Sequence, residues 1–435
     1  MKIVFYCYGT RGDIQPHLVL SKELKDKGHQ VLMVCGKRLK YLVEQFELDC
    51  DVIEDDGLDL LFSTELQKKD LDSFLDIRAN LYTEKPEILN QYLKSSVGMD
   101  LIIPSGLCIA EAMTVSEKLS IPYIPVLLQP SRTGELVCSF FSKRSSLYFS
   151  FLNKLSHSLF IKGVSKVEKR RVDRWRKEIM GLGSLDENFI EVLAQDPNMC
   201  NIHAYDKILF PKECVPSDYQ PGWKVVGFLY PQEHIIKHIP DKLTKGNFFE
   251  EEEEECDVSY KDLPIVFGLG SIPISDRQKL VSILKYTIEK LGTDTKWIIL
   301  NNWTDWEEDF ECENVIQLDN VDHLWLFRYC SIAIIHGGIG SCAAVMKSAI
   351  PSIVTHFYFD QPINARKLED LGISISLDYF KLTQEQFLES IVKIKNNYQI
   401  FKNQCLQVAS KLKLNALDET INLIESNYMD SSRDQ

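Results

Sequence analysis

The chain has 435 residues, which is too long for one ordinary hydrophobic core and predicts two domains of roughly 200 residues each. Its composition, with 45% hydrophobic and 26% charged residues, is that of a globular protein and excludes a disordered chain. The formal net charge of -14 would repel nucleic acid, so we expect no nucleic acid partner.

Cysteine usage and hydropathy indicate the expected compartment. The twelve cysteines are scattered without a CxxC pair, and no cleavable signal precedes the first apolar run, Lys2 to Cys7. We therefore expect reduced thiols and a cytoplasmic protein. No apolar stretch approaches the roughly 18 residues that span a bilayer, so any membrane contact is expected to be peripheral.

The first part of the chain predicts a parallel α/β sheet. Residues 3–7 form a short apolar run that ends in a glycine loop at 9–12, and the leucines that follow it have a helical period. Three further runs predict buried strands, at 30–35, 100–104 and 123–128. Buried strands that alternate with helices favour a parallel sheet wound on both faces.

The same pattern of strands and helices begins again after a central segment in which no strand or helix is predicted. A strand runs from Leu263 into a glycine loop at Gly270-Ser271, and four more strands are predicted at 297–300, 315–317, 332–335 and 352–355. The segment before it contains six consecutive glutamates, Glu250 to Glu255, which repel one another and predict a linker. The predicted organisation is a first domain over 1–231, an acidic linker over 232–262, a second domain over 263–428 and a loose tail over 429–435.

A glycine-rich turn in the second half has the composition of a phosphate site. In residues 334–344 a strand ends in glycines, a hydroxyl follows, and a helix of small residues begins. Exposed N–H groups and the dipole of a helix N-terminus attract phosphate, and glycines allow a close approach. His336 and Ser341 each offer a hydrogen bond to a phosphate oxygen. The alternative is a tight strand-to-helix turn with a capping serine.

Two neighbouring segments add polar groups suited to a sugar nucleotide. Asp360-Gln361 follows the strand at 352–355 and offers acceptors and donors for sugar hydroxyls, at the sheet edge where α/β folds bind ligands. Val321 opens a short segment upstream of the glycine turn. Trp325 in that segment either stacks on a base or anchors a short helix.

The first glycine loop supplies a candidate general base. Asp13 follows Gly12 directly, and a positioned carboxylate can remove the proton of an attacking hydroxyl. The alternative is an aspartate that caps the following helix with Arg11 as its salt partner. His17 is a second candidate base, and we rank it below Asp13 because its position indicates the first turn of the helix.

Together, the motif from Gly9 to Pro16 and the donor segments resemble the sterol glucosyltransferases and the related glycopeptide-antibiotic glycosyltransferases. The resemblance implies the GT-B architecture, with two Rossmann-like doubly wound lobes facing across a cleft. It also implies inverting transfer of a hexose, glucose from UDP-glucose, to a sterol or other hydrophobic alcohol, with Asp13 as base and without metal or cofactor. The donor residues that it implies are Gly12, Gly270, Ser271, Val321, His336, Gly338, Gly340, Ser341, Asp360 and Gln361.

Three departures from the family pattern leave the substrates open. Cys342 stands where a hydroxyl is common, Ile363-Asn364 replace a Phe-Trp pair, and Ser105 begins a segment that lacks the family's paired histidines. A different sugar, a polyketide-like or glycopeptide-like acceptor, or a catalytically silent lipid- or nucleotide-binding protein of the same fold therefore stay as alternatives. An oxidoreductase ranks low because neither glycine loop has the G-x-G-x-x-G pattern.

A basic segment interrupts the acidic chain. Residues 132–177 contain twelve Lys or Arg against three Asp or Glu, interleaved with aromatic residues. Basic residues beside exposed aromatics suit an anionic membrane surface, from which a lipid acceptor is drawn. A helical lid with its aromatics in the core predicts the same pattern, so both interpretations stay open.

Overall fold

In the computed structural model the chain forms two compact units, one from Met1–Pro231 with Lys413–Gln435 and one from Gln232–Leu412. The described residues are 1–54, 57, 71–129, 150–191, 196, 199–210, 215, 219–231, 263–270, 274, 276–301, 310, 312–319, 321–358 and 360–431. The predicted linker at 232–262, Ser271 and the first part of the basic segment, 132–149, lie outside them.

The first unit is built on a parallel sheet in the order β3-β2-β1-β4. β1 (Lys2–Tyr6) is central and pairs with β2 (Gln30–Gly36) on one side and β4 (Leu101–Pro104) on the other. β3 (Asp49–Ile53) pairs with β2 and forms the edge. All of β4 and all but the first residue of β1 are buried, because strands covered on both faces need apolar side chains on both.

A second, smaller sheet continues from this one. A parallel bridge joins Ile102 to Tyr123, and the chain then forms β5 (Val126–Leu127), which pairs with β6 (Asn201–His203). β6 pairs in turn with β7 (Trp223–Val225). The strand predicted over 123–128 is therefore present as a bridge and a short strand.

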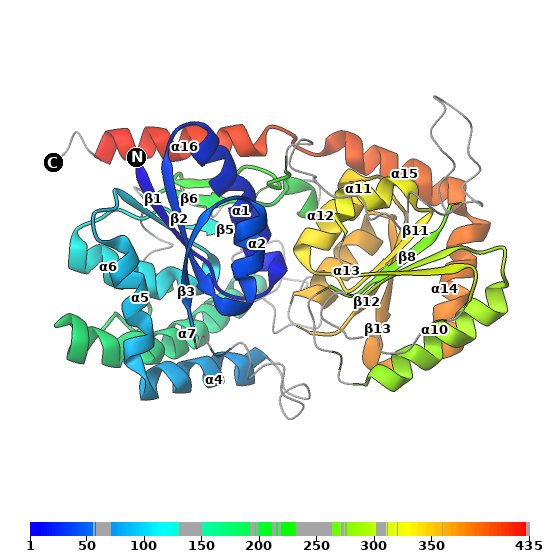
Figure 1. Ribbon diagram of the computed structural model, residues 1–435, viewed down its shortest axis with the longest axis horizontal. Helices are drawn as coiled ribbons and strands as arrows, with labels where there is room; N and C mark the ends of the chain where they lie inside the picture. Colours follow the sequence, from blue (N-terminus) through cyan, green and yellow to red (C-terminus); the bar gives the residue numbers. More distant parts are fainter. Residues whose placement is uncertain are drawn as a thin grey trace. The chain divides into compact units, whose positions relative to one another are not determined.

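Helices flank the sheets of the first unit (Figure 1). α1 begins at a capping box in which the Thr10 hydroxyl accepts from the Asp13 backbone and the Asp13 carboxylate accepts from the Thr10 backbone. The α-helices described between residues 1 and 231 are α1 (Arg11–Asp26), α2 (Lys40–Gln45), α4 (Leu71–Glu84), α5 (Asn90–Ser96), α6 (Ile109–Leu119) and α7 (Ser150–Arg174).

The second unit has a parallel sheet in the order β10-β9-β8-β11-β12-β13. Its core is formed by apolar side chains of the inner strands, which pack against helices such as α10 and α14. The strands are β8 (Ile265–Gly268), β9 (Trp297–Leu300), β10 (Val315–Leu318), β11 (Ile332–Ile335), β12 (Ser352–His356) and β13 (Ser374–Asp378). The helices are α10 (Arg277–Leu291), α11 (His323–Leu326), α12 (Ile339–Lys347), α13 (Gln361–Asp370), α14 (Gln384–Asn396) and α15 (Tyr398–Lys411).

Each large sheet has a point at which its strand order reverses. In the second unit the chain moves outward from β8 to β10 on one side and from β11 to β13 on the other. In the first unit β1 leads to β2 and β3 on one side, while β4 lies on the other. Ligands of open α/β sheets bind outside the carboxyl ends of the strands at such points. The loops after β1, β8 and β11 therefore lie where open α/β sheets bind their ligands.

The C-terminal helix corrects the predicted domain boundary, which placed 413–428 in the second domain. α16 (Ala416–Ser431) belongs to the first unit and lies beside α1 (Figure 1). Its inward side chains, such as Ile421, are fully buried, and Glu425 lies 3.0 Å from the Nε2 atom of His29. The helix belongs there because it covers apolar surface of the first unit.

The C-terminal part of the chain forms two helices, because α15 ends at Lys411 and α16 starts at Ala416. The tail predicted from Met429 is helical as far as Ser431. Within the described residues, no helix combines the length and the apolar character needed to cross a bilayer.

Candidate functional site

His336 is the first residue after β11, and two glycines enclose its ring. A Cβ atom on Gly270, which follows β8, would lie 2.5 Å from Cε1 of His336, and a Cβ atom on Gly338 would lie 2.4 Å from Nε2. Both distances are shorter than carbon and nitrogen atoms tolerate. Two of the predicted donor glycines therefore serve to make room for the imidazole, at the reversal point of the sheet.

The imidazole of His336 is neutral in this site. Burial lowers its pKa to about 4, because the charged form loses its hydration. The Nδ1 atom is buried and has no hydrogen-bond partner among the described residues. A neutral ring keeps one N–H donor, which suits a hydrogen bond to an anion better than a proton transfer.

The glycine turn leads into the N-terminus of α12. Gly338 is the N-cap residue, no side chain caps the helix, and the Cys342 N–H donates to the Gly338 carbonyl at 3.0 Å. The amides of Ile339, Gly340 and Ser341 in the first turn are thus left for a ligand. The alternative of a capping serine is wrong, because Ser341 lies inside the helix.

Gly340 and Cys342 differ in their surroundings. Gly340 is exposed, and a Cβ atom there would meet no protein atom within 4 Å. Cys342 is fully buried, and burial raises the pKa of its thiol well above the ordinary range. Cys342 therefore occupies the protein side of α12, where it acts as a small apolar residue.

Asp360 is joined to the glycine turn through Asn364. The Nδ2 atom of Asn364 donates to Oδ2 of Asp360 at 2.6 Å and to the carbonyl oxygen of Gly337 at 3.0 Å. Asn364 lies one turn after Asp360 on α13, so the helix sets this geometry. The sequence identified Asn364 only as a departure from the family pattern, whereas the structure gives it a role in holding two parts of the site.

Gln361 has a largely structural role. Its side chain is 3% exposed, and its Oε1 atom accepts hydrogen bonds from the N–H groups of Phe357 at 2.9 Å and Tyr358 at 3.3 Å. This oxygen is therefore occupied by the loop after β12. Only the amide nitrogen of Gln361 is left to contact a ligand.

A buried lysine lies about one turn after Asn364 on α13. Lys367 is 8% exposed, and burial lowers its pKa to about 8, while the Asp360 carboxylate opposes that shift. The ammonium group therefore places positive charge near the Asp360 carboxylate at neutral pH. The sequence analysis did not identify this residue, because a lysine on a helix is usually exposed.

Val321 and Trp325 lie on the other side of the glycine turn. Val321 is buried, and Asp322 caps α11 by accepting from the Trp325 N–H at 3.0 Å. The ring of Trp325 is half-buried and packs against Tyr329 at 5.0 Å between centroids. α11 itself packs against α12. Trp325 therefore anchors this short helix, as one of the two interpretations predicts.

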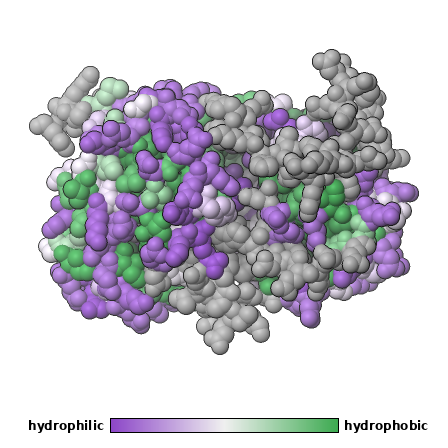
Figure 2. All heavy atoms as spheres, in the orientation of Figure 1, coloured by the Kyte–Doolittle hydropathy of each residue, from purple (hydrophilic) through white to green (hydrophobic). Residues whose placement is uncertain are grey.

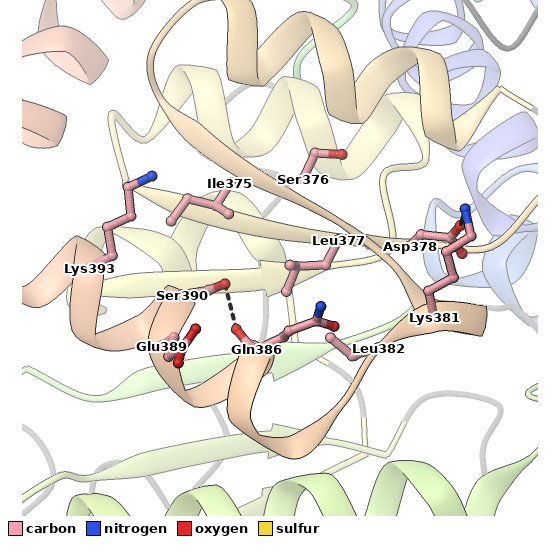
Figure 3. Close-up of a pocket in the computed structure, with 10 residues that line it drawn as sticks. All are labelled: Ile375, Ser376, Leu377, Asp378, Lys381, Leu382, Gln386, Glu389, Ser390 and Lys393. Atoms are coloured by element: carbon pink, nitrogen blue, oxygen red, sulfur yellow. Dashed lines mark hydrogen bonds and ion pairs between the residues drawn. The ribbon is translucent and has the colours of Figure 1, made fainter.

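A shallow pocket in this unit lies away from the predicted site. It has a volume of about 400 Å³ and lies between β13 and α14, with Asp378 and Lys393 among its lining residues (Figure 3). None of the predicted donor residues lines it. In the described part of the chain, no cluster of three or more His, Cys, Asp or Glu side chains is arranged to hold a metal ion.

Asp13 lies in the first turn of α1, after the loop that follows β1. Its Oδ2 atom accepts from the Thr10 N–H at 2.7 Å and from the Thr10 hydroxyl at 3.1 Å. The Asp13 carboxylate therefore caps the start of α1, as the alternative interpretation predicts. Arg11 donates a hydrogen bond to the side chain of Gln15 at 3.0 Å. No hydrogen bond to Oδ1 is found among the described residues, so one carboxylate oxygen is left for a substrate proton.

Burial raises the pKa of Asp13 above its ordinary value, and the two hydrogen bonds from Thr10 oppose that shift. A raised pKa makes this carboxylate a better proton acceptor than a solvated one. Asp13 packs so closely on residue 9 that only glycine fits there. Gly9 has a φ of +121°, and a Cβ atom added to it would lie 2.3 Å from Oδ2 of Asp13. Gly12 is exposed in the same turn, and a Cβ atom there would meet only the Thr10 hydroxyl, at 3.8 Å.

His17 is unsuited to act as the base. It is fully buried, its Nδ1 atom lies 3.0 Å from the Asp13 carbonyl oxygen, and its Nε2 atom lies 3.2 Å from the Val126 carbonyl oxygen. Burial lowers its pKa to about 4. Both nitrogens face backbone acceptors, so His17 ties α1 to β5 and leaves no nitrogen for a substrate.

Two family models match the two halves of the chain. Residues 3–132 match the glycosyltransferase family 28 N-terminal domain, and residues 308–417 match the C-terminal domain of erythromycin biosynthesis protein CIII-like proteins. The first match contains the Asp13 loop, and the second contains the His336 turn and Asp360. The chain is therefore similar to glycosyltransferases in both of its halves.

Its similarity to curated proteins covers most of its length. It is 27% identical over 415 residues to the sterol 3-beta-glucosyltransferase of Komagataella phaffii, covering 92% of this chain and 32% of that protein. It is 25% identical over 426 residues to the enzyme of the same name from Saccharomyces cerevisiae, covering 93% of this chain and 33% of that protein. This glycosyltransferase homologue thus spans about a third of the length of the relatives that it matches.

Solved structures confirm the GT-B fold. The glycotransferase of kitacinnamycin has a TM-score of 0.70 at 15% identity, and the alignment covers 98% of this chain and 99% of that one. The spinosyn forosaminyltransferase SpnP has a TM-score of 0.65, also at 15% identity, with the same coverage of both chains. At this identity the likeness establishes the fold and no substrate.

Proposed function

We propose that this protein is an inverting glycosyltransferase that transfers a hexose, glucose from UDP-glucose, to the hydroxyl group of a sterol or another hydrophobic alcohol. The observation that carries the proposal is the chemistry at the reversal points of the two large sheets. One has a carboxylate with a raised pKa, and the other has an anion-binding turn. The similarity to sterol 3-beta-glucosyltransferases supports the choice of donor and acceptor.

The donor diphosphate binds at the N-terminus of α12 in this proposal. Amides of Gly340 and Ser341 and the ring N–H of His336 donate to its oxygens. Because His336 is neutral, it contributes a hydrogen bond and no net charge. Asp360, held by Asn364, accepts hydrogen bonds from sugar hydroxyls, and the amide nitrogen of Gln361 donates one. Val321 and Trp325 lie on the side where the nucleobase packs.

The acceptor hydroxyl is activated by Asp13. As its proton passes to the free oxygen of the Asp13 carboxylate, the hydroxyl oxygen bonds to the anomeric carbon. The bond from that carbon to the diphosphate oxygen breaks, and the electron pair leaves with the nucleoside diphosphate. One displacement inverts the anomeric centre. The amides of α12 stabilise the charge of the leaving group without a metal ion or a cofactor.

The decisive experiment is an assay of the purified chain with a panel of nucleotide sugars and mixed lipid alcohols. We expect donor consumption and a hexosylated sterol by mass spectrometry, with UDP-glucose the preferred donor. A product formed only from polyketide-like or glycopeptide-like alcohols would replace the acceptor class. Binding of UDP without consumption of any donor would contradict the enzymatic proposal and favour a binding protein.

A sterol is dissolved in a bilayer, so a protein that modifies it must reach a membrane surface. Contact with an anionic membrane through the basic segment is therefore part of the proposed function.

A further inference from the structure

α7 carries an outward face of unusual composition. Phe151, Leu155 and Leu159, which are 63%, 51% and 61% exposed, follow one another at intervals of four residues. At 100° per residue they lie with Lys162 and Lys166 inside an arc of roughly 80°. We call these five residues the α7 face. Hydrophobic patches also occur elsewhere on the surface (Figure 2), so apolar exposure alone does not distinguish this face.

Buried ionic contacts fix which side of α7 points outward. Arg171 donates to Oε2 of Glu111 on α6 at 2.8 Å, and Arg78 on α4 donates to Oε1 of the same carboxylate at 3.1 Å. Glu168 also pairs with Arg171, at 3.2 Å from its Nε atom. α4 and α7 pack side by side (Figure 1). The helix cannot rotate to bury its apolar residues without exposing these ions.

The charges of α7 are divided between its two halves. At the C-terminal end of α7 and in the helical turn that follows it, exposed cations are paired: Arg170 with Asp76, Arg174 with Glu178 at 2.9 Å, and Lys177 with Asp173 at 2.7 Å. Residues 150–167 contain no acidic residue. Lys162 and Lys166 are exposed and have no ion-pair partner in the described part of the chain. Among the described residues of α7, uncompensated positive charge therefore lies beside the exposed apolar side chains.

We infer that the α7 face docks on an anionic lipid surface, with its three apolar side chains in the headgroup region and its lysines on acidic headgroups. Uncompensated lysines in a chain of net charge -14 select an anionic partner. Apolar side chains on the same arc select one with an accessible hydrocarbon layer. The inference narrows the basic segment 132–177 to one face and deepens the proposed function, because it names the surface that supplies the acceptor.

The test is flotation of the purified full chain, without donor or acceptor, with vesicles of phosphatidylcholine alone and with about a third phosphatidylserine. We expect binding to the anionic vesicles only, weakening with added salt. Lys162→Glu with Lys166→Glu should lower the partition coefficient by at least about 25-fold, from roughly fivefold for each lysine lost. Serine at 151, 155 and 159 should lower it by at least about tenfold.

Matched controls separate this face from general effects. Lys285→Glu with Lys290→Glu makes the same change of charge on exposed positions of α10, and serine at 392, 400 and 406 removes exposed apolar residues of α14 and α15. Both controls should bind anionic vesicles like the native chain. Equal loss in a control and in the matching α7 variant would overturn the inference. So would equal binding of the native chain to neutral and anionic vesicles.

Two further readouts distinguish other roles of the face. If the α7 serine variant melts several degrees lower, the face packs within the protein, and if it converts a dimer to a monomer with vesicle binding unchanged, the partner is a second copy. Either result overturns the inference. The α7 variants should keep transfer to a detergent-dispersed sterol and lose transfer to a sterol in anionic vesicles. Vesicle binding without any transfer would contradict the proposed function alone.

Discussion

At the scale of single residues, the site depends on how closely glycines approach His336. Gly338→Ala places a methyl group 2.4 Å from the present position of Nε2, at a φ of -61° that alanine accepts without strain. The ring must move, so we expect the Kd for UDP to rise at least about tenfold with little change in Tm. Calorimetric titration with UDP measures it, and unchanged affinity would contradict the role of His336.

Gly340→Ala is the matched comparison two residues further on. A methyl group there meets no protein atom, so the fold is unaffected and the helix is slightly stabilised. If the diphosphate lies on the first turn of α12, this variant still binds UDP more weakly. Native affinity in Gly340→Ala would place the diphosphate elsewhere.

The neutrality of His336 gives a prediction about pH. With a pKa of about 4, the ring loses no proton between pH 5 and pH 8, so its contribution to UDP affinity should be constant there. Below pH 5 the fraction of imidazolium rises and anion binding should tighten. The Kd of native protein and His336→Gln is to be measured across this range. A tightening between pH 8 and pH 6 that His336→Gln abolishes would show that the imidazolium is the binding form.

Asn364 offers a test of the sugar side. Asn364→Asp keeps the shape but places a carboxylate where the amide donates to Asp360 at 2.6 Å. Repulsion should displace Asp360 and raise the KM for the nucleotide sugar about tenfold or more, with a smaller effect on UDP affinity. Asn403→Asp on the exposed side of α15 is the control. Equal losses for nucleotide sugar and UDP would show that Asn364 acts only through Gly337.

Candidate site residues that belong to a motif could be identified from the sequence. Contacts between residues from distant segments could not. Asp13 and His336 were identified because a reactive residue follows glycines at a strand end. The packing of Gly9 on Asp13 and of Gly270 on His336 depends on loop conformation, which spacing does not specify. Lys367 was missed because only the folded helix shows that it is buried beside Asp360.

At the scale of elements, the buried strands of the two large sheets were predictable, whereas the edge strands β3 and β13 were not. β9 and β11 are fully buried, and their apolar runs gave their bounds from the sequence. β3 and β13 lie at sheet edges, are only partly buried and carry polar residues, so they have no continuous apolar run. The missed strands extend the sheets without moving the loops after β1 and β11.

The membership of α16 in the first unit predicts a local effect. Ile421 is fully buried, so Ile421→Ala should cost about 2 to 5 kcal/mol of stability, as for other large-to-small core changes. Hydrogen exchange should show loss of protection in the first unit around α1, with the second unit unchanged. Loss of protection confined to β8 to β13 would contradict the assignment.

At the scale of the whole molecule, two similar sheets serve different chemistry because different residues follow their central strands. The loop after β1 holds a carboxylate with a raised pKa, and the turn after β11 holds a neutral imidazole and free helix amides. Periodicity alone predicted two α/β units. The assignment of the last helix required knowledge of which apolar surface it covers, and its sequence periodicity is the same for either unit.

The central claim is that Asp13 accepts the proton of the acceptor hydroxyl. Asp13→Asn keeps an oxygen to accept from the Thr10 N–H and removes the base, so α1 should stay capped. The direct measurement is kcat for transfer to a sterol, with the Kd for UDP determined on the same sample. We predict a loss in kcat of about 10² to 10⁴ with the Kd within threefold. Native kcat in Asp13→Asn would contradict the account.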